Sequence, residues 1–358
     1  MSAAEAFHAY LTDRAAADAF AGVALLTRGD TPLFAEAYGY ASRAWQVKAD
    51  LHTRYDTASV TKLFTAVAVL QLIDQGRLAF DTRAVEYLQL TGTAIHPAAN
   101  VYHLLTHTSG MGDDADEEAG EDYAAVWQTW PNYTVIETAE HLPQFQHKPA
   151  NFAPGQGVRY CNASYLLLGL MIERASGLRY RDYVRRHVFA PAGMAASDFF
   201  RMDRLEPNVA EGADPLRDAA GAIVGWKRNI YSYPPVGSPD GGAHVTAGDL
   251  ERFLRAVQGG ALLSPQLTAA FFNPQVLYKE RSGGQTEYNG YGLWFQRDAA
   301  GQVLSYAKEG INAGASAFLR HWPAAGITVV LLSNLEEGVW QPMHFVAAQI
   351  EAGAWGTS

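Results

Sequence analysis

The sequence predicts an α+β fold: one antiparallel sheet built from N- and C-terminal segments, flanked by helices, with a large, mainly helical region inserted between them. Strand-like runs gather near both ends of the chain, whereas residues from about 57 to 257 read mainly as helix and long loop. The chain has 358 residues, of which 48% are hydrophobic, so it can bury a large core. These proportions exclude a disordered or fibrous protein.

A β-hairpin is expected directly after an N-terminal helix. Residues 22–28 and 33–40 are short apolar runs, and Gly29, Asp30 and Pro32 between them favour a turn. The C-terminal end mirrors this pattern with four strand-like runs and a final amphipathic stretch that we expect to be helical. The strand-like runs are residues 291–297, 302–308, 314–321 and 327–333, and the helical stretch is residues 339–352.

Apolar residues at helical spacing predict the helices of the inserted region. The clearest of these are residues 61–75, 163–175, 180–189 and 248–257. Neither a repeat nor a flexible linker separates the two regions, so we expect them to share an interface. We predict a sheet domain of residues 1–56 and 285–358 and a mainly helical domain of residues 57–284.

The charge balance excludes several classes of partner. Lysine and arginine number 27 against 37 acidic residues, a formal net charge of −10, and no basic run is present, so we expect neither nucleic acid nor an anionic membrane as a partner. Cys161 is the single cysteine, so no intrachain disulfide or thiolate metal cluster can form. Several charges near the N-terminus and the lack of a long apolar span predict a cytoplasmic protein, whose oligomeric state the sequence leaves open.

The apolar helix of residues 61–75 carries a single lysine that needs an explanation. Ser59 and Lys62 are three residues apart, so on a helix the Oγ and Nζ atoms can form a hydrogen bond. Burial disfavours the ammonium form, and a neutral lysine can accept the proton of a serine nucleophile. Free N–H groups at the start of the helix could stabilise an oxyanion beside Ser59. The alternative is a helix-cap serine beside a lysine that reaches solvent.

The same spacing recurs in Ser305 and Lys308, which lie in a strand-like run. Residues three apart on a strand point to opposite faces, so Ser305 cannot use Lys308 as its base. Of the two pairs, only Ser59 and Lys62 can therefore form a hydrogen bond between serine and lysine side chains.

Two further segments carry candidate site residues. Tyr160 and Asn162 stand where a loop meets a predicted helix; a phenol there can relay protons, and an amide can donate to a substrate carbonyl. The alternative is that Asn162 caps the helix and Tyr160 belongs to the core. At the predicted end of a strand, Lys308 can hold a substrate carboxylate or tune the tyrosine, and Gly310 permits close approach of a backbone. The alternative is that this segment is simply the end of a strand and has no functional role.

These segments together resemble the serine β-lactamase and penicillin-binding protein superfamily, above all its class C β-lactamase and esterase branch. The resemblance covers most of residues 21–334. Besides the site segments, the supporting stretches are Leu104 to Gly110, Phe152 to Gly155, Asp240 to Gly242, Thr246 to Leu250 and Leu331 to Asn334.

The resemblance implies a role for each matching residue. Ser59 would be the acylated nucleophile, Lys62 its base and Tyr160 the second member of the proton relay. Asn162, Lys308 and Gly310 would contact the substrate, and the backbone N–H groups of Ser59 and Ile311 would form the oxyanion hole. Glu309 departs from the family's usual threonine, and its charge weakens attraction for a substrate carboxylate, which argues against efficient penicillin turnover.

An acidic run and a pair of histidines are weaker indications of function, and we expect a structural explanation for each. Residues 113–122 include seven acids in the run DDADEEAGED, which we expect to be a solvated loop; if it overhangs the site, it favours cationic substrates. His103 and His107 could share a metal on a helix, but no third ligand is near in sequence, so we expect no metal.

We therefore expect a serine hydrolase that works through an acyl-enzyme and needs no cofactor, with the active site where the two regions meet. A carboxylesterase acting on short or medium acyl esters is the leading hypothesis, with a small-molecule ester or amide as substrate. A β-lactamase, a D-amino-acid amidase or peptidase and an acyltransferase are alternatives on the same fold. A penicillin-binding or scaffold protein without turnover is the alternative of another class.

Overall fold

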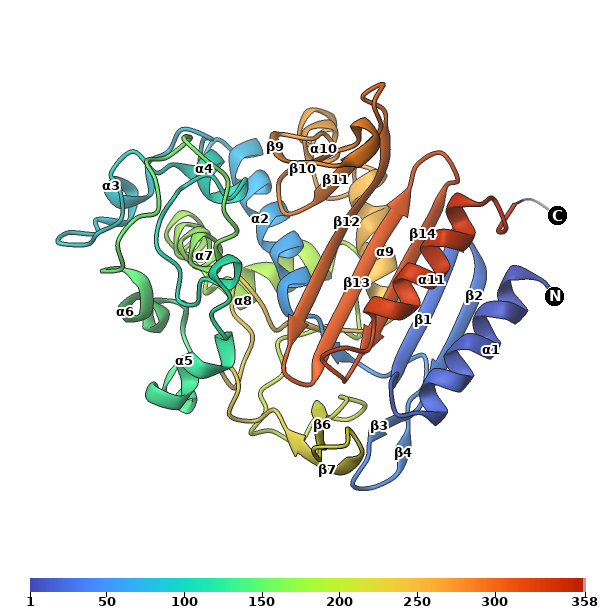
Figure 1. Cartoon of the computed structure of the whole chain (residues 1–358). Helices are drawn as coiled ribbons and strands as arrows, with labels where there is room; N and C mark the ends of the chain where they lie inside the picture. The colour runs from blue at the N-terminus through green and yellow to red at the C-terminus, as the bar shows by residue number, and fades with distance from the viewer. Residues whose placement is uncertain (357–358) are drawn as a thin grey trace.

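A computed structural model describes residues 1–356, and its centre is an eight-stranded antiparallel sheet (Figure 1). The strand order is β2-β1-β14-β13-β12-β11-β10-β9. From the N-terminal segment come β1 (Gly22–Arg28) and β2 (Thr31–Tyr38). The C-terminal segment supplies β9 (Val276–Glu280), β10 (Thr286–Asn289), β11 (Trp294–Arg297), β12 (Val303–Asn312), β13 (Ala315–Trp322) and β14 (Ile327–Ser333). Because β1 pairs with β14, the two ends of the chain form one sheet, and the predicted α+β fold is confirmed.

Helices cover both faces of the sheet (Figure 1). On one face lie α1 (Ala3–Ala16) and α11 (Trp340–Glu351), whose apolar side chains pack with Phe34, Phe318 and Val329 in an outer core. On the other face lies a larger inner core, to which α2 (Lys62–Asp74), α7 (Asn162–Ser176) and α9 (Ala247–Gln258) contribute. The inserted region is therefore packed against the sheet rather than tethered to it.

The helix α2 runs through the middle of the inner core. Nine consecutive residues from Lys62 to Leu70 are buried, because the segment has almost no polar face. Gly76 adopts a φ of 67° just after the helix, as its predicted position at the helix end requires.

The remaining elements of the inserted region are short. Its other helices are α3 (Ala84–Leu88), α4 (Val101–Leu105), α5 (Tyr123–Thr129), α6 (Leu142–Phe145), α8 (Tyr180–Val184), which continues as the π-turn η5 (Arg185–Phe189), and α10 (Pro265–Phe271). The 3₁₀ turns are η1 (Ala58–Thr61), η2 (Glu117–Ala119), η3 (Asn132–Thr134), η4 (Thr138–His141) and η6 (Ser282–Gly284). Three small two-stranded sheets pair β3 (Tyr40–Ser42) with β4 (Val47–Lys48), β5 (Tyr55–Asp56) with β8 (His244–Val245), and β6 (Ala213–Arg217) with β7 (Ile223–Arg228).

The structure corrects some predicted boundaries. The strand expected to end at Lys308 continues to Asn312, because β12 pairs with β13 as far as Asn312 opposite Ala315. The strand β9 joins the sheet although it precedes residue 285, the predicted start of the second sheet segment. The division into two domains remains a prediction. Within residues 1–356, no helix has the length and apolar character needed to cross a membrane.

Candidate active site

Ser59 lies in the single 3₁₀ turn η1, directly before α2. The preceding residue, Ala58, has a φ of 43°, a backbone conformation that non-glycine residues rarely adopt. Asp56 holds this strained turn, because its Oδ1 accepts the Ala58 N–H at 2.7 Å. Backbone strain of this kind is common where a side chain is held for function.

Lys62 is fully buried, and its amine contacts three acceptors. Nζ donates to Ser59 Oγ at 2.9 Å, to Asn162 Oδ1 at 2.7 Å and to the Asp240 carbonyl oxygen at 2.6 Å. Burial lowers the pKa of Lys62 to about 8, although the Asp240 carboxylate opposes this shift. A neutral amine has two N–H bonds and one lone pair. When the ammonium loses the proton that it donates to Ser59, Asn162 and Asp240 still accept the two remaining N–H groups, and the lone pair faces Ser59 Oγ. Because Lys62 is fully buried, the alternative of a lysine reaching solvent is wrong.

Tyr160 approaches the same hydroxyl from the other side. Its phenol O–H donates to Ser59 Oγ at 2.7 Å, and the Nζ atoms of Lys62 and Lys308 lie 5.0 and 4.9 Å from its ring centre. Burial raises the pKa of Tyr160 well above its usual value, and the Glu117 carboxylate adds to this effect. The phenol therefore keeps its proton at neutral pH, whereas Lys62 loses its proton far more readily.

Asn162 is the first residue of α7, and both ends of its side-chain amide already have protein partners. Oδ1 accepts from Lys62, and Nδ2 donates to Glu117 Oε1 at 2.9 Å. A substrate would have to compete with Glu117 for this amide. Asn162 does not cap the helix; that role belongs to Asp113, whose carboxylate accepts the N–H groups of Asn162 and Ala163 at 2.7 and 2.8 Å.

The strand β12 brings the last predicted residues to the site. Lys308 is only 6% exposed, and its ammonium has no hydrogen-bond or ion-pair partner among residues 1–356. A Cβ added to Gly310 would lie 2.2 Å from the Thr57 carbonyl oxygen, so only glycine lets β12 pass this close to η1. Ile311 follows and lines the cavity beside Ser59. Its participation in an oxyanion hole remains a prediction.

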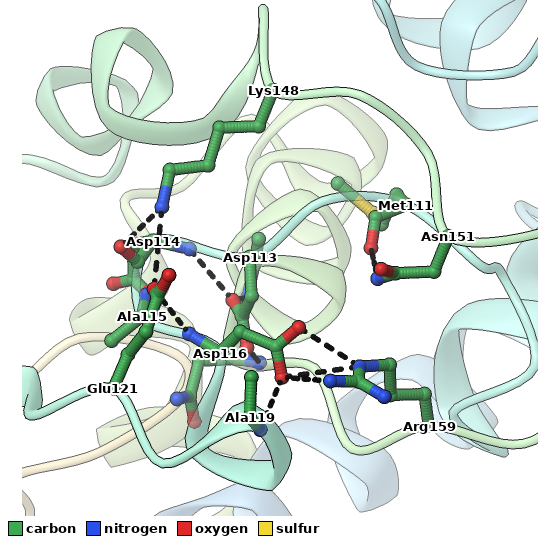
Figure 2. A network of polar contacts seen from close by, with 12 residues as sticks. Met111, Asp113, Asp114, Ala115, Asp116, Ala119, Glu121, Lys148, Asn151 and Arg159 are labelled. Atoms are coloured by element: carbon green, nitrogen blue, oxygen red, sulfur yellow. Dashed lines mark hydrogen bonds and ion pairs between the residues drawn. The ribbon is translucent and has the colours of Figure 1, made fainter.

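The acidic stretch is only in part the solvated loop that we expected: residues 117–122 are exposed, but its first residues are not. Asp113 and Asp114 are buried, and Figure 2 shows them in a network in which Asp116 holds Arg159 at 2.6 Å. Glu118 Oε1 accepts the Tyr160 N–H at 2.8 Å. Together with Asp113 and Glu117, these side chains hold residues 159–163 in place, while Glu117 also lines the cavity at Ser59.

His107 also holds the segment of residues 159–163 in place. Its Nδ1 accepts the Cys161 N–H at 3.1 Å, its carbonyl oxygen accepts the Arg159 N–H at 2.9 Å, and its ring lies 4.6 Å from the Tyr160 ring. Burial lowers the pKa of His107 well below its usual value, so it stays neutral. Its φ of 59° marks a second strained residue near Ser59. The sequence marks His107 as a possible metal ligand and as part of the stretch Leu104 to Gly110, but not this positioning role, which depends on contacts across more than 50 residues of chain.

Comparison with known proteins agrees with this geometry. The family model described as Beta-lactamase matches residues 7–349. The chain belongs to the beta-lactamase family. Among curated relatives of this family member, esterase EstB of Burkholderia gladioli is 29% identical over 90% of the chain and 88% of its own length. Penicillin-binding protein 4* of Bacillus subtilis is 25% identical over 89% of the chain and 69% of its own length.

Solved structures of the family show the same architecture. The penicillin-binding protein of Bacillus halodurans superimposes with a TM-score of 0.86 at 36% identity, covering 97% of this chain and 99% of its own. A D-stereospecific amidohydrolase from Streptomyces sp. superimposes with a TM-score of 0.77 at 22% identity, covering 99% of both chains, which establishes a common fold. The chain is thus a serine hydrolase of the β-lactamase and penicillin-binding protein fold.

Proposed function

We propose that this family member is a carboxylesterase that forms an acyl-enzyme on Ser59. The observation that carries the proposal is the position of Ser59 Oγ, 2.9 Å from Lys62 Nζ and 2.7 Å from Tyr160 Oη. A serine hydroxyl held between a base with a depressed pKa and a phenol that keeps its proton has what an acyl-transfer nucleophile requires.

The steps follow from these positions. Neutral Lys62 accepts the Ser59 proton as Oγ attacks the ester carbonyl carbon. The N–H groups of Ser59 and Ile311 stabilise the resulting oxyanion. The bond from carbon to the alcohol oxygen then breaks, Tyr160 donates its proton to that oxygen, and Lys62 returns a proton to Tyr160. Water attacks the acyl-enzyme by the same route in reverse, and the products are a carboxylic acid and an alcohol.

The environment of Lys308 supports an ester rather than a penicillin as substrate. Lys308 could attract a substrate carboxylate, and Arg281 and Arg320 also line its cavity, but so do four glutamates: Glu117, Glu118, Glu287 and Glu309. Their negative charges oppose the approach of a carboxylate. The named esterase among the relatives also favours this assignment.

The test is a panel assayed with the wild type and with Ser59→Ala: p-nitrophenyl esters, a chromogenic cephalosporin and D-alanine p-nitroanilide. We expect turnover of the esters, little lactam hydrolysis, and loss of both in the variant. Fastest turnover of the anilide would indicate an amidase, and efficient transfer to an added alcohol would indicate an acyltransferase. Stoichiometric acylation of Ser59 without turnover would contradict the proposal and favour a binding protein.

A further inference from the structure

Two cavities of very different size meet at Ser59. They share only Ser59, Glu117 and Ile311 among their lining residues. Ser59 Oγ and the Ile311 N–H are the groups proposed to engage the scissile carbonyl. A bound ester would therefore have its carbonyl at the junction, with its acyl part in one cavity and its alcohol part in the other.

The smaller cavity, here called the narrow arm, has a free volume of about 30 Å³. A water molecule needs about 10–15 Å³ measured in this way, so the arm holds roughly two or three water-sized groups. Its walls include Phe200, Met202 and Val236, and Val236 is only 5% exposed. Long chains therefore do not fit the narrow arm unless the half-buried side chains of Phe200 and Met202 move.

The larger cavity, here called the wide arm, has a free volume of about 610 Å³. It extends from Ser59 past Tyr160 and Trp294 to Trp340 and Met343 on α11. This volume is in the range of cavities that bind drug-sized molecules. Its walls combine aromatic side chains, such as Trp294 and Trp340, with charged ones, such as Glu287 and Arg320.

The position of Tyr160 decides which part of the ester occupies each arm. Tyr160 lines the wide arm and not the narrow arm. The phenol must reach the departing alcohol oxygen to protonate it, so the alcohol lies on the side of Tyr160. We infer that the substrates are esters of a small acid, with two or three carbons, and a bulky alcohol. This inference rests on the proposed esterase function and adds the class of ester.

Two substrate series test the inference. The first varies the acyl chain in p-nitrophenyl acetate, butyrate and octanoate. The second keeps the acetyl group and replaces p-nitrophenol by the larger 4-methylumbelliferone, a leaving group of similar acidity. We expect kcat/KM to fall at least about tenfold from acetate to octanoate, but to change by less than about threefold between the two alcohols.

A matched pair of variants assigns each effect to its arm. Phe200→Ala should raise the octanoate-to-acetate ratio of kcat/KM at least about fivefold by widening the narrow arm, and Met202→Ala should act in the same direction. Trp340→Ala in the wide arm should leave that acyl ratio unchanged and alter the ratio between the two alcohols. Circular dichroism and melting temperature verify that each variant is folded.

Octanoate turnover equal to that of acetate in the wild type would overturn the inference while leaving the proposed esterase intact. An altered acyl ratio in Trp340→Ala would reverse the assignment of the arms and also overturn it. If neither series is turned over and Ser59 takes up no acyl group, the proposed function fails, and the inference fails with it.

Discussion

At the scale of single residues, the burial of Lys62 explains most of the chemistry. An exposed lysine is protonated at neutral pH and cannot act as a base. Full burial lowers the pKa of Lys62 to about 8, and the two fixed acceptors, Asn162 and Asp240, direct its lone pair at Ser59. The same residues would be inert if the helix were on the surface.

The pH dependence of the reaction follows from this pKa. The neutral amine is the base, so kcat/KM should rise with pH, reach half its plateau near pH 8 and then level off.

Lys62→Arg keeps the charge but cannot accept a proton, so kcat/KM should fall by about 10²–10⁴-fold. Pre-steady-state release of p-nitrophenol against pH measures both effects. An unchanged pH profile in a still active Lys62→Arg variant would exclude Lys62 as the base.

A second prediction concerns the buried pair of Asp113 and Asp114. Burial raises the pKa of Asp113 to about 6 and that of Asp114 well above its usual value, and Asp114 Oδ2 has no hydrogen-bond partner within residues 1–356. A carboxyl with a raised pKa stabilises the fold at low pH, and this contribution is lost as the pH rises through its folded-state pKa. Asn resembles the protonated acid, so Asp114→Asn should lose less stability than the wild type between pH 5 and 8. Melting temperatures across this range test it; parallel curves would contradict it.

At the scale of elements, the site depends on a close approach between η1 and β12. Gly310 passes so near η1 that a Cβ would lie 2.2 Å from the Thr57 carbonyl oxygen and 2.8 Å from the Ser59 nitrogen. Because the two elements lie this close together, Ile311 of β12 and Ser59 of η1 line the same cavity. The acidic stretch likewise fixes the segment of Tyr160 against the start of α2.

Gly310→Ala should therefore separate β12 from η1 and lower kcat/KM at least about tenfold, because the two proposed oxyanion donors would move apart. Gly225→Ala is the matched control. Gly225 also lies in a strand, but an added Cβ would have no atom closer than 3.7 Å. Ester kinetics and melting temperatures of both variants give the comparison. Equal kinetics in Gly310→Ala and Gly225→Ala would show that the close approach is not needed.

At the scale of the whole molecule, the sheet separates two apolar cores with different tasks. The outer core joins α1 and α11 to the sheet, whereas the inner core contains the apolar residues of α2, the helix that carries Lys62. Phe7 on α1 is fully buried in the outer core, 5.1 Å from the Phe34 ring. This layer holds the two ends of the chain together. Its residues Phe318 and Met343 also line the wide arm, whereas Phe7 lines neither arm.

Phe7→Ala should therefore destabilise the fold by about 3–5 kcal/mol without changing the kinetics of the folded enzyme. Chemical denaturation measures the loss, and KM and kcat at a temperature well below the melting transition provide the control. A specific change in KM would show that the packing around Phe7 shapes the active site.

Local patterns predicted much of this arrangement. Ser59 and Lys62 were identifiable because a helical turn brings residues three apart together, and the strand geometry correctly separated Ser305 from Lys308. In the structure Ser305 Oγ accepts from Arg320 instead. The strand β9 was not predicted, because its five residues are mostly exposed and lack an apolar alternation. The acidic stretch is exposed over residues 117–122, as its composition predicts. The burial of Asp113 and the contacts of the stretch with Arg159 to Ala163 are not predictable from it, because these partners lie more than 40 residues away.

The sequence by itself determined the fold class, the ends that form the sheet and the serine–lysine pair, since each depends on contacts within a few residues or on the period of apolar side chains. The tertiary structure decided the rest. Tyr160 and Asp240 reach Ser59 and Lys62 across 101 and 178 residues of chain. The spacing of residues along the chain does not encode such contacts. They form when the two apolar cores pack against the sheet, because this packing places each buried polar group beside one particular set of hydrogen-bond partners.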